Sequence, residues 1–333
     1  MRAGAAATAS VPPPVRRDLA RTGGNREAER ENTFYFLRYA PRVRFAISTS
    51  FQPLDHLVPI ARAADELGYH SLGVPDHVVD LEELATPYPY TRDGSRRWRP
   101  HTAWPDPWVL IGALSSVTTR LRFFTSVYVP ALRNPFQVAK SVGTAAVLSG
   151  NRVSLGVGIG WCREEFELLG EDFTTRGRRT DEALELMAEL WSPGWTEYDG
   201  DFYRAPRLMM EPTPTERIPV LVGGLSDVAI RRAARHDGWV GDLYSIDEAG
   251  ALAARLAEAR ARIGADGDFA VITALTDAFL PEHFARAEAL GVTDCWTMPW
   301  AYYHGLEATL EQKLESMERF AEDVLRPLGT ASR

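Results

Sequence analysis

The most constraining feature of the sequence is a repeated alternation between short β-type runs and helical stripes, which continues from Val43 almost to the C-terminus. The first run, Val43–Ser48, is followed by Leu54–Leu67, whose apolar positions recur with helical spacing and end at Gly68. Further β-type runs follow in the same manner, each ahead of a helix or of a loop and a helix. Eight such units in about 290 residues favour a parallel (β/α)8 TIM barrel over a doubly wound sheet.

The predicted strands are short, mostly apolar runs at Val43–Ser48, Ser71–Val74, Leu121–Val129, Arg152–Val157, Ile218–Val222, Gly238–Val240, Phe269–Leu275 and Asp294–Met298. The predicted helices are the segments Leu54–Leu67, Trp108–Val117, Pro135–Leu148, Thr180–Trp191, Asp227–His236, Asp247–Ile263, Pro281–Leu290 and Leu306–Leu325. A small hairpin is expected at Trp195–Tyr203. Because no linker or composition break divides this region, we expect one α/β domain over residues 43–328, with functional groups at the C-terminal ends of its strands.

Residues 1–42 are rich in Ala, Arg and Pro and lack the apolar stretch of about 7–15 residues that a signal peptide requires. We therefore expect a disordered N-terminal extension ahead of the domain. The chain is 45% hydrophobic and 25% charged, and no segment approaches the roughly 18 apolar residues that cross a membrane. These properties predict a soluble cytoplasmic protein with a large core and no membrane partner.

The charge and the cysteine content exclude two further classes. The net charge is −8, and the segment 1–42 carries eight Arg against four acidic residues, so the remainder of the chain carries −12. An acidic body repels phosphate backbones, so we expect no nucleic-acid partner. Two cysteines, Cys162 and Cys295, and seven scattered His provide no disulfide framework and no metal-binding spacing, so we expect no metal.

Asp76 and His77 follow the second predicted strand and open a long loop that ends near Asp106. The two residues either cap local backbone amides, or His77 points into the barrel mouth for proton transfer while Asp76 fixes its tautomer or a nearby amide. The proline and aromatic content of the loop is typical of a folded lid. Its four arginines either form a solvated face or attract an acidic ligand; they are Arg92, Arg96, Arg97 and Arg99.

Glycines gather after two other strands. Alternate glycines at Gly156, Gly158 and Gly160 would let a planar or phosphorylated ligand approach the backbone, but their spacing and position do not match a dinucleotide-binding fingerprint. Gly223 and Gly224 lead through Ser226 into a predicted helix. That arrangement suits either an anion site or a plain turn capped by Ser226. Asp227 would repel a phosphate there unless its side chain turned away.

Together these segments resemble the luciferase-like monooxygenase superfamily over residues 43–325, and in particular its branch of coenzyme F420-dependent oxidoreductases. The segments that carry the resemblance are 152–161, 163–166, 179–182, 195–203, 222–224 and 237–239, with Arg231 and Ala233. The resemblance implies a bacterial luciferase-like barrel. It also implies a non-prolyl cis peptide at Ser126–Val127, against which the cofactor ring bends, and a proton donor or acceptor at His77. The cofactor-binding residues that it implies are Asp76, Ser126, Val127, Gly158, Gly160, Trp161, Gly223, Gly224 and Ser226.

Two departures from the family limit what is carried over. Ile159 stands where light-emitting relatives hold phosphate with an Arg, and Trp161 stands where a sugar-phosphate dehydrogenase of the family has a catalytic Glu. The resemblance therefore implies hydride transfer between F420 and a small organic substrate other than a sugar phosphate. The alternatives are an FMN-dependent monooxygenase with a reductase partner and a non-catalytic barrel that stores or senses flavin. A homodimer is common in the family, but no helix pattern identifies its interface.

Overall fold

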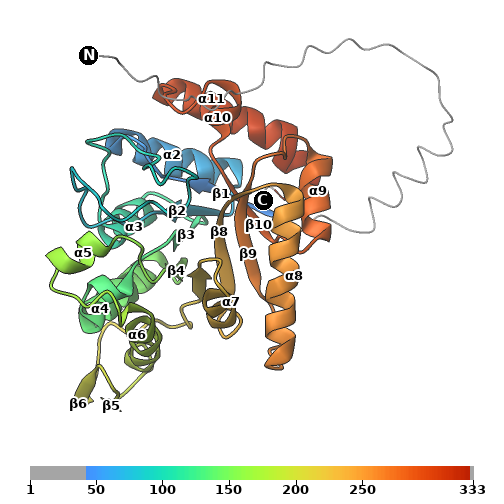
Figure 1. Cartoon of the computed structure of the whole chain (residues 1–333). Helices are drawn as coiled ribbons and strands as arrows, with labels where there is room; N and C mark the ends of the chain where they lie inside the picture. Colours follow the sequence, from blue (N-terminus) through green and yellow to red (C-terminus); the bar gives the residue numbers. More distant parts are fainter. Residues whose placement is uncertain (1–42, 331–333) are drawn as a thin grey trace, which may run out of the picture. The chain divides into compact units, whose positions relative to one another are not determined.

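The computed structural model describes residues 43–330, which form a closed barrel of parallel strands surrounded by helices (Figure 1). In order around the barrel, the strands are β1 (Arg44–Ser48), β10 (Asp294–Thr297), β9 (Ala270–Leu275), β8 (Gly238–Tyr244), β7 (Val220–Gly223), β4 (Val153–Val157), β3 (Arg122–Thr125) and β2 (Ser71–Val74). Pairing of β1 with both β10 and β2 closes the ring. The predicted (β/α)8 fold is confirmed, and the prediction for residues 1–42 lies outside the described residues.

The helices pack their apolar faces on the outside of this barrel, where they form the main core cluster. They are α2 (Leu54–Leu67), α3 (Pro107–Ser115), α4 (Pro135–Ser149), α5 (Arg163–Leu168), α6 (Arg176–Leu190), α7 (Asp227–Ala233), α8 (Ile246–Arg262), α9 (Pro281–Ala289), α10 (Pro299–Tyr303), α11 (Leu310–Phe320) and α12 (Arg326–Leu328), with a 3-10 turn η1 (Pro130–Leu132) and a π-helical turn η2 (Ala321–Leu325). Among residues 43–330, no helix is both long and apolar enough to cross a membrane.

Several predicted boundaries were wrong, each for a local reason. The third strand stops at Thr125, because a cis peptide at Ser126–Val127 interrupts it. The last long helix starts at Leu310 and not at Leu306, because Thr309 caps its N-terminus in a capping box with Gln312. The hairpin consists of β5 (Thr196–Asp199) and β6 (Arg204–Leu208), which extends beyond the predicted range. Helices α5 and α10 were not predicted.

The interior of the barrel is filled by its own small cluster of apolar side chains. These residues are Ala46, Phe124, Leu221, Val240 and Ile272. Val127 and Trp296, both partly buried and both near the carboxyl ends of their strands, pack against this cluster. The barrel is thus blocked along its axis, and any ligand at the carboxyl end must lie above Val127 and Trp296.

The loop that leads into β3 is held by one carboxylate on α2. Asp65 accepts hydrogen bonds from the amides of Thr119 and Arg120, both at 2.8 Å, and from the amide of Leu121 at 2.6 Å. Burial raises the pKa of Asp65, but these hydrogen bonds outweigh burial and leave the pKa below its usual value. The carboxylate therefore positions the start of β3 relative to α2.

We predict that Asp65→Asn lowers the free energy of unfolding at pH 7 by about 1–3 kcal/mol, because the new amide group leaves backbone donors unpaired. Since the folded-state pKa is depressed, this contribution is complete above the unfolded-state pKa and is lost as the pH falls through the folded-state value. Urea unfolding at pH 7 and pH 3 should show the difference from wild type shrinking at the lower pH. Asp266→Asn, at an exposed position, is the matched control. An equal loss in both variants would contradict the prediction.

Candidate active site at the carboxyl end of the barrel

His77 lies just beyond β2, and its imidazole is held by a carboxylate from α5. Nδ1 of His77 lies 3.1 Å from Oε2 of Glu165, whose side chain is only 5% exposed. The other oxygen of Glu165 accepts the backbone amides of Val78 at 2.8 Å and Val79 at 3.4 Å. Because an ionised carboxylate only accepts hydrogen bonds, the Nδ1 atom carries the proton. Nε2 has no partner among residues 43–330 and is the ring atom left for a ligand.

The carboxylate of Asp76 is fully engaged with Arg133 and Val129. Its two oxygens bind the Arg133 guanidinium at 2.7 and 2.8 Å, and one of them also accepts the Val129 amide at 3.0 Å. Burial raises the pKa of Asp76, and Arg133 and Val129 oppose that effect. The side chain has no exposed surface. Asp76 therefore fixes a nearby amide, as one alternative predicted, and its carboxylate pairs with Arg133 while His77 pairs with Glu165.

The glycines after β4 and β7 make room for Val127. The peptide bond Ser126–Val127 is cis, as the resemblance predicts. A Cβ atom on Gly158 would lie 2.6 Å from Cγ2 of Val127, and one on Gly223 would lie 3.1 Å from its Cγ1. The close approach that these glycines permit is therefore made by a side chain of the protein itself, and Val127 forms a small apolar floor at the carboxyl end of the barrel.

Gly160 and Gly224 are required by the backbone. Gly160 has φ of +81°, and a Cβ there would also lie 2.7 Å from the ring of Phe166. Gly224 has φ of +111°, and its carbonyl oxygen accepts the indole N–H of the buried Trp239 at 2.8 Å. Both residues occupy the left-handed region that side chains disfavour, so each turn has a structural reason to be glycine.

Ser226 caps the helix that follows these glycines. Its hydroxyl accepts the amide of Ala229 at 3.2 Å, so the cap predicted for this residue is confirmed. Asp227 turns away and pairs with Arg255 at 3.0 Å. Helix α7 is only seven residues long, and the turn-and-cap alternative accounts for this segment.

An aromatic lid covers His77. The loop after β2 places Trp98 and Trp104 against the imidazole, with ring centroids at 5.1 and 4.8 Å, and Trp161 lies 5.9 Å away on another side. Tyr88 contacts both Trp98 and Trp161 edge to face. The indole N–H of Trp104 is buried and has no hydrogen-bond partner within the described part of the chain. The site therefore combines one acid–base side chain, flat aromatic walls and one unsatisfied donor.

Glu164 and the lid arginines hold this loop in place. Glu164 accepts the amides of Ala85 and Thr86, both at 2.8 Å. Burial raises the pKa of Glu164, but these amides outweigh burial and lower the pKa to about 2. Arg97 reaches Asp242 on β8 at 2.8 Å.

Arg96 pairs with Asp80 within the loop at 2.6 Å. Arg99 faces Glu307 at 3.4 Å, with both side chains largely exposed. The solvated-face interpretation therefore fits Arg99, while Arg96 and Arg97 are structural ties of the lid.

Glu165, Trp98 and Trp104 were not predicted as site residues. The loop aromatics were recognised as parts of a lid, but their partners were not. Glu165 is 88 positions from His77 in the sequence, so no local pattern predicts the contact between them. The adjacent carboxylates of Glu164 and Glu165, directly after a glycine-rich strand end, were the available sequence signal.

Comparison with known proteins gives a matching family model and several sequence relatives. The family model described as luciferase-like monooxygenase matches residues 34–289, and so begins within the segment predicted to be a tail. An uncharacterized protein of Mycobacterium tuberculosis is 38% identical over 286 residues, which cover 85% of this chain and 99% of that protein. An F420-dependent glucose-6-phosphate dehydrogenase of Segniliparus rotundus is 33% identical over 201 residues, 59% of this chain and 55% of that protein.

Solved structures with the same fold differ in cofactor. An F420-dependent secondary alcohol dehydrogenase, in complex with an F420-acetone adduct, has a TM-score of 0.61 and 16% identity, and the match covers 86% of this chain and 99% of that one. The oxygenating constituent of 3,6-diketocamphane monooxygenase of Pseudomonas putida, in complex with FMN, has a TM-score of 0.63 and 14% identity. The match covers 85% of this chain and 98% of that one. At these identities the likeness shows the fold alone.

We predict that Gly158→Ala lowers the free energy of unfolding by about 1–3 kcal/mol, because the new methyl group overlaps Val127 in a packed region. Gly112→Ala is the control, since a Cβ there meets nothing and alanine favours helix α3 by up to about 1 kcal/mol. Thermal unfolding of both variants measures the contrast. Equal stability of the two variants would show that the packing of Val127 does not require a glycine at position 158.

Proposed function

Because the chain belongs to the luciferase-like monooxygenase family, we propose that it transfers a hydride between coenzyme F420 and a small organic substrate, with His77 as the acid or base. The observation that carries the proposal is the pairing of Nδ1 of His77 with the buried Glu165, which leaves Nε2 beneath an aromatic lid. A sequence relative named as F420-dependent supports this cofactor over FMN.

Hydride transfer to or from an alcohol or carbonyl group also requires movement of one proton. When bound, F420 supplies the hydride donor or acceptor. For oxidation of an alcohol, Nε2 of His77 takes the hydroxyl proton while Nδ1 donates to Glu165, whose negative charge balances the imidazolium. For reduction of a carbonyl group, the protonated ring returns that proton to the oxygen. Trp98 and Trp104 keep bulk water away from this exchange.

The residues present suit a flat ring of the flavin type. Val127 gives an apolar floor, the lid indoles give flat walls, and the unsatisfied N–H of Trp104 is a donor for a polar edge of cofactor or substrate. We keep the following as proposed cofactor contacts: Ser126, Val127, Gly158, Gly160, Trp161, Gly223, Gly224 and Ser226.

Trp161 contacts His77 and Tyr88 and cannot transfer a proton, so we propose a substrate other than the sugar phosphate of the named relative.

Titration of the full-length protein with F420 and, separately, with FMN tests the cofactor. We expect saturable quenching of tryptophan fluorescence by F420, because Trp98, Trp104 and Trp161 surround the site. Tight FMN binding without affinity for F420 would replace the proposal with an FMN-dependent monooxygenase that receives reduced flavin from a reductase partner.

We predict that His77→Ala lowers kcat about 100-fold or more while F420 binding is retained. Glu165→Gln should lower kcat about tenfold or more and alter the pH profile, with little change in KM, because the imidazole loses its fixed tautomer. Glu167→Gln, at an exposed position on the same helix, is the matched control. Full turnover in His77→Ala would remove His77 as the acid or base, whereas cofactor binding without any turnover by the wild type would favour a barrel that only stores or senses flavin.

A further inference from the structure

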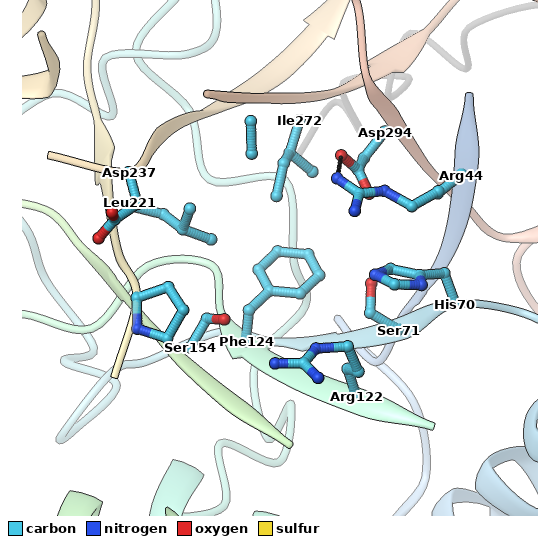
Figure 2. A pocket seen from close by; sticks show the side chains of 12 residues that line it. Arg44, His70, Ser71, Arg122, Phe124, Ser154, Leu221, Asp237, Ile272 and Asp294 are labelled. Atoms are coloured by element: carbon cyan, nitrogen blue, oxygen red, sulfur yellow. Dashed lines mark hydrogen bonds and ion pairs between the residues drawn. The ribbon is translucent and has the colours of Figure 1, made fainter. Parts of the chain in front are cut away.

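The opposite end of the barrel contains a cavity of about 330 Å³ (Figure 2). Its walls come from the first residues of the strands, among them Arg44 of β1, Ser71 of β2 and Arg122 of β3. The interior cluster beneath Val127 separates it from the site at His77. Its volume falls at the lower end of the range of about 300–1,000 Å³ found for small-molecule sites.

Of the two arginines and two aspartates that line this cavity, three are engaged in ion pairs. Arg44 pairs with Asp294 at 2.7 Å, and the carboxylate of Asp237 pairs with Arg217. Arg122, in contrast, makes one side-chain hydrogen bond within residues 43–330, from Nη2 to the carbonyl oxygen of Asn151 at 3.2 Å. A guanidinium group has five N–H donors, so Arg122 retains one positive charge and most of its donors.

Arg152, at the same end of the barrel, is a purely structural arginine, because its guanidinium donors are used by hydrogen bonds within the protein. Its guanidinium donates to the carbonyl oxygens of Ser115, Leu121 and Ser149 at 2.6–2.8 Å, and it also bonds both the hydroxyl and the carbonyl oxygen of Thr118. Compared with this saturated group, Arg122 is available to a ligand.

Further polar groups at the cavity lack partners. The ring of His70 and the hydroxyls of Ser71 and Ser154 form no hydrogen bond with any of residues 43–330. Burial, followed by the charge of Arg44, lowers the pKa of His70 to about 4, so its ring is neutral at physiological pH. Among residues 43–330, Arg122 is therefore the lining charge that lies outside an ion pair, and it lies in the cavity together with neutral donors and acceptors.

The rest of the lining is apolar. In Figure 2, Arg44, His70 and Arg122 lie on one side of the Phe124 ring, and Leu221 lies on the other. Ile272 completes the apolar part of the wall. A doubly charged phosphate would leave a charge unpaired against these side chains, whereas a monoanion with an apolar body matches both parts of the lining.

We propose that this cavity binds a small monocarboxylate, whose carboxylate group pairs with Arg122 and whose apolar body packs on Phe124, Leu221 and Ile272. The site is separate from the proposed active site and does not depend on the identity of the cofactor there.

Calorimetric titration of the full-length protein with benzoate tests the site. We expect saturable binding to the wild type, at least tenfold weaker binding to Arg122→Gln, and unchanged binding to Arg62→Gln, in which an exposed arginine of α2 is neutralised in the same way. Because Arg122 lies at the amino end of the barrel, weaker binding in Arg122→Gln together with unchanged binding in Arg62→Gln assigns benzoate to this cavity and not to the carboxyl-end site. Ser154→Leu, which fills the cavity without altering charge, should abolish binding and serves as the second variant if Arg122→Gln does not fold.

Two further probes complete the test, one neutral and one with a different charge. Benzamide, which has the shape of benzoate without its charge, should bind at least tenfold more weakly, and inorganic phosphate should not compete with benzoate. Equal benzoate affinity in Arg122→Gln, absence of saturable benzoate binding, or displacement of benzoate by phosphate would overturn the assignment.

Discussion

Closure of the parallel sheet is the constraint on which every other part of this structure depends. Strand β1 pairs with β10 in a register that places Arg44 beside Asp294, two residues 250 positions apart in the chain. Once this pair forms, all carboxyl ends of the strands point the same way, and loops that are distant in sequence share one mouth. The contact between His77 and Glu165 arises in this way, because the strands that precede them, β2 and β4, both pair with β3.

Much of the fold followed from periodicity, because β-type runs and helical stripes repeat with clear punctuation. The contacts that individual residues make inside the barrel were harder to predict from the sequence. Gly158 and Gly223 were correctly singled out as sites of close approach, but the approaching group is Val127, whose location depends on a peptide geometry that only family resemblance indicated. Asp76 was paired with His77 because the two are neighbours in sequence, whereas its oxygens bind Arg133 from a different loop. Such pairings depend on tertiary contacts, which local patterns do not encode.

The arginines at the two ends of the barrel are mostly structural. At the carboxyl end, Arg97 and Arg133 are matched by Asp242 and Asp76, and their charges hold loops in place. At the amino end, Arg44 and Arg217 are likewise matched by Asp294 and Asp237, in keeping with the general use of that face for stability. Arg122 is the exception, because it pairs with no carboxylate among residues 43–330.

Helix α5 is short, yet its first turn supports two separate stretches of the lid: Glu164 binds the amides of Ala85 and Thr86, and Glu165 binds those of Val78 and Val79. Glu165 also orients His77. Displacement of this one turn would therefore break the contacts of both stretches and of the imidazole together. Under the proposed function, the same turn would couple the position of the loop to the orientation of the acid–base group.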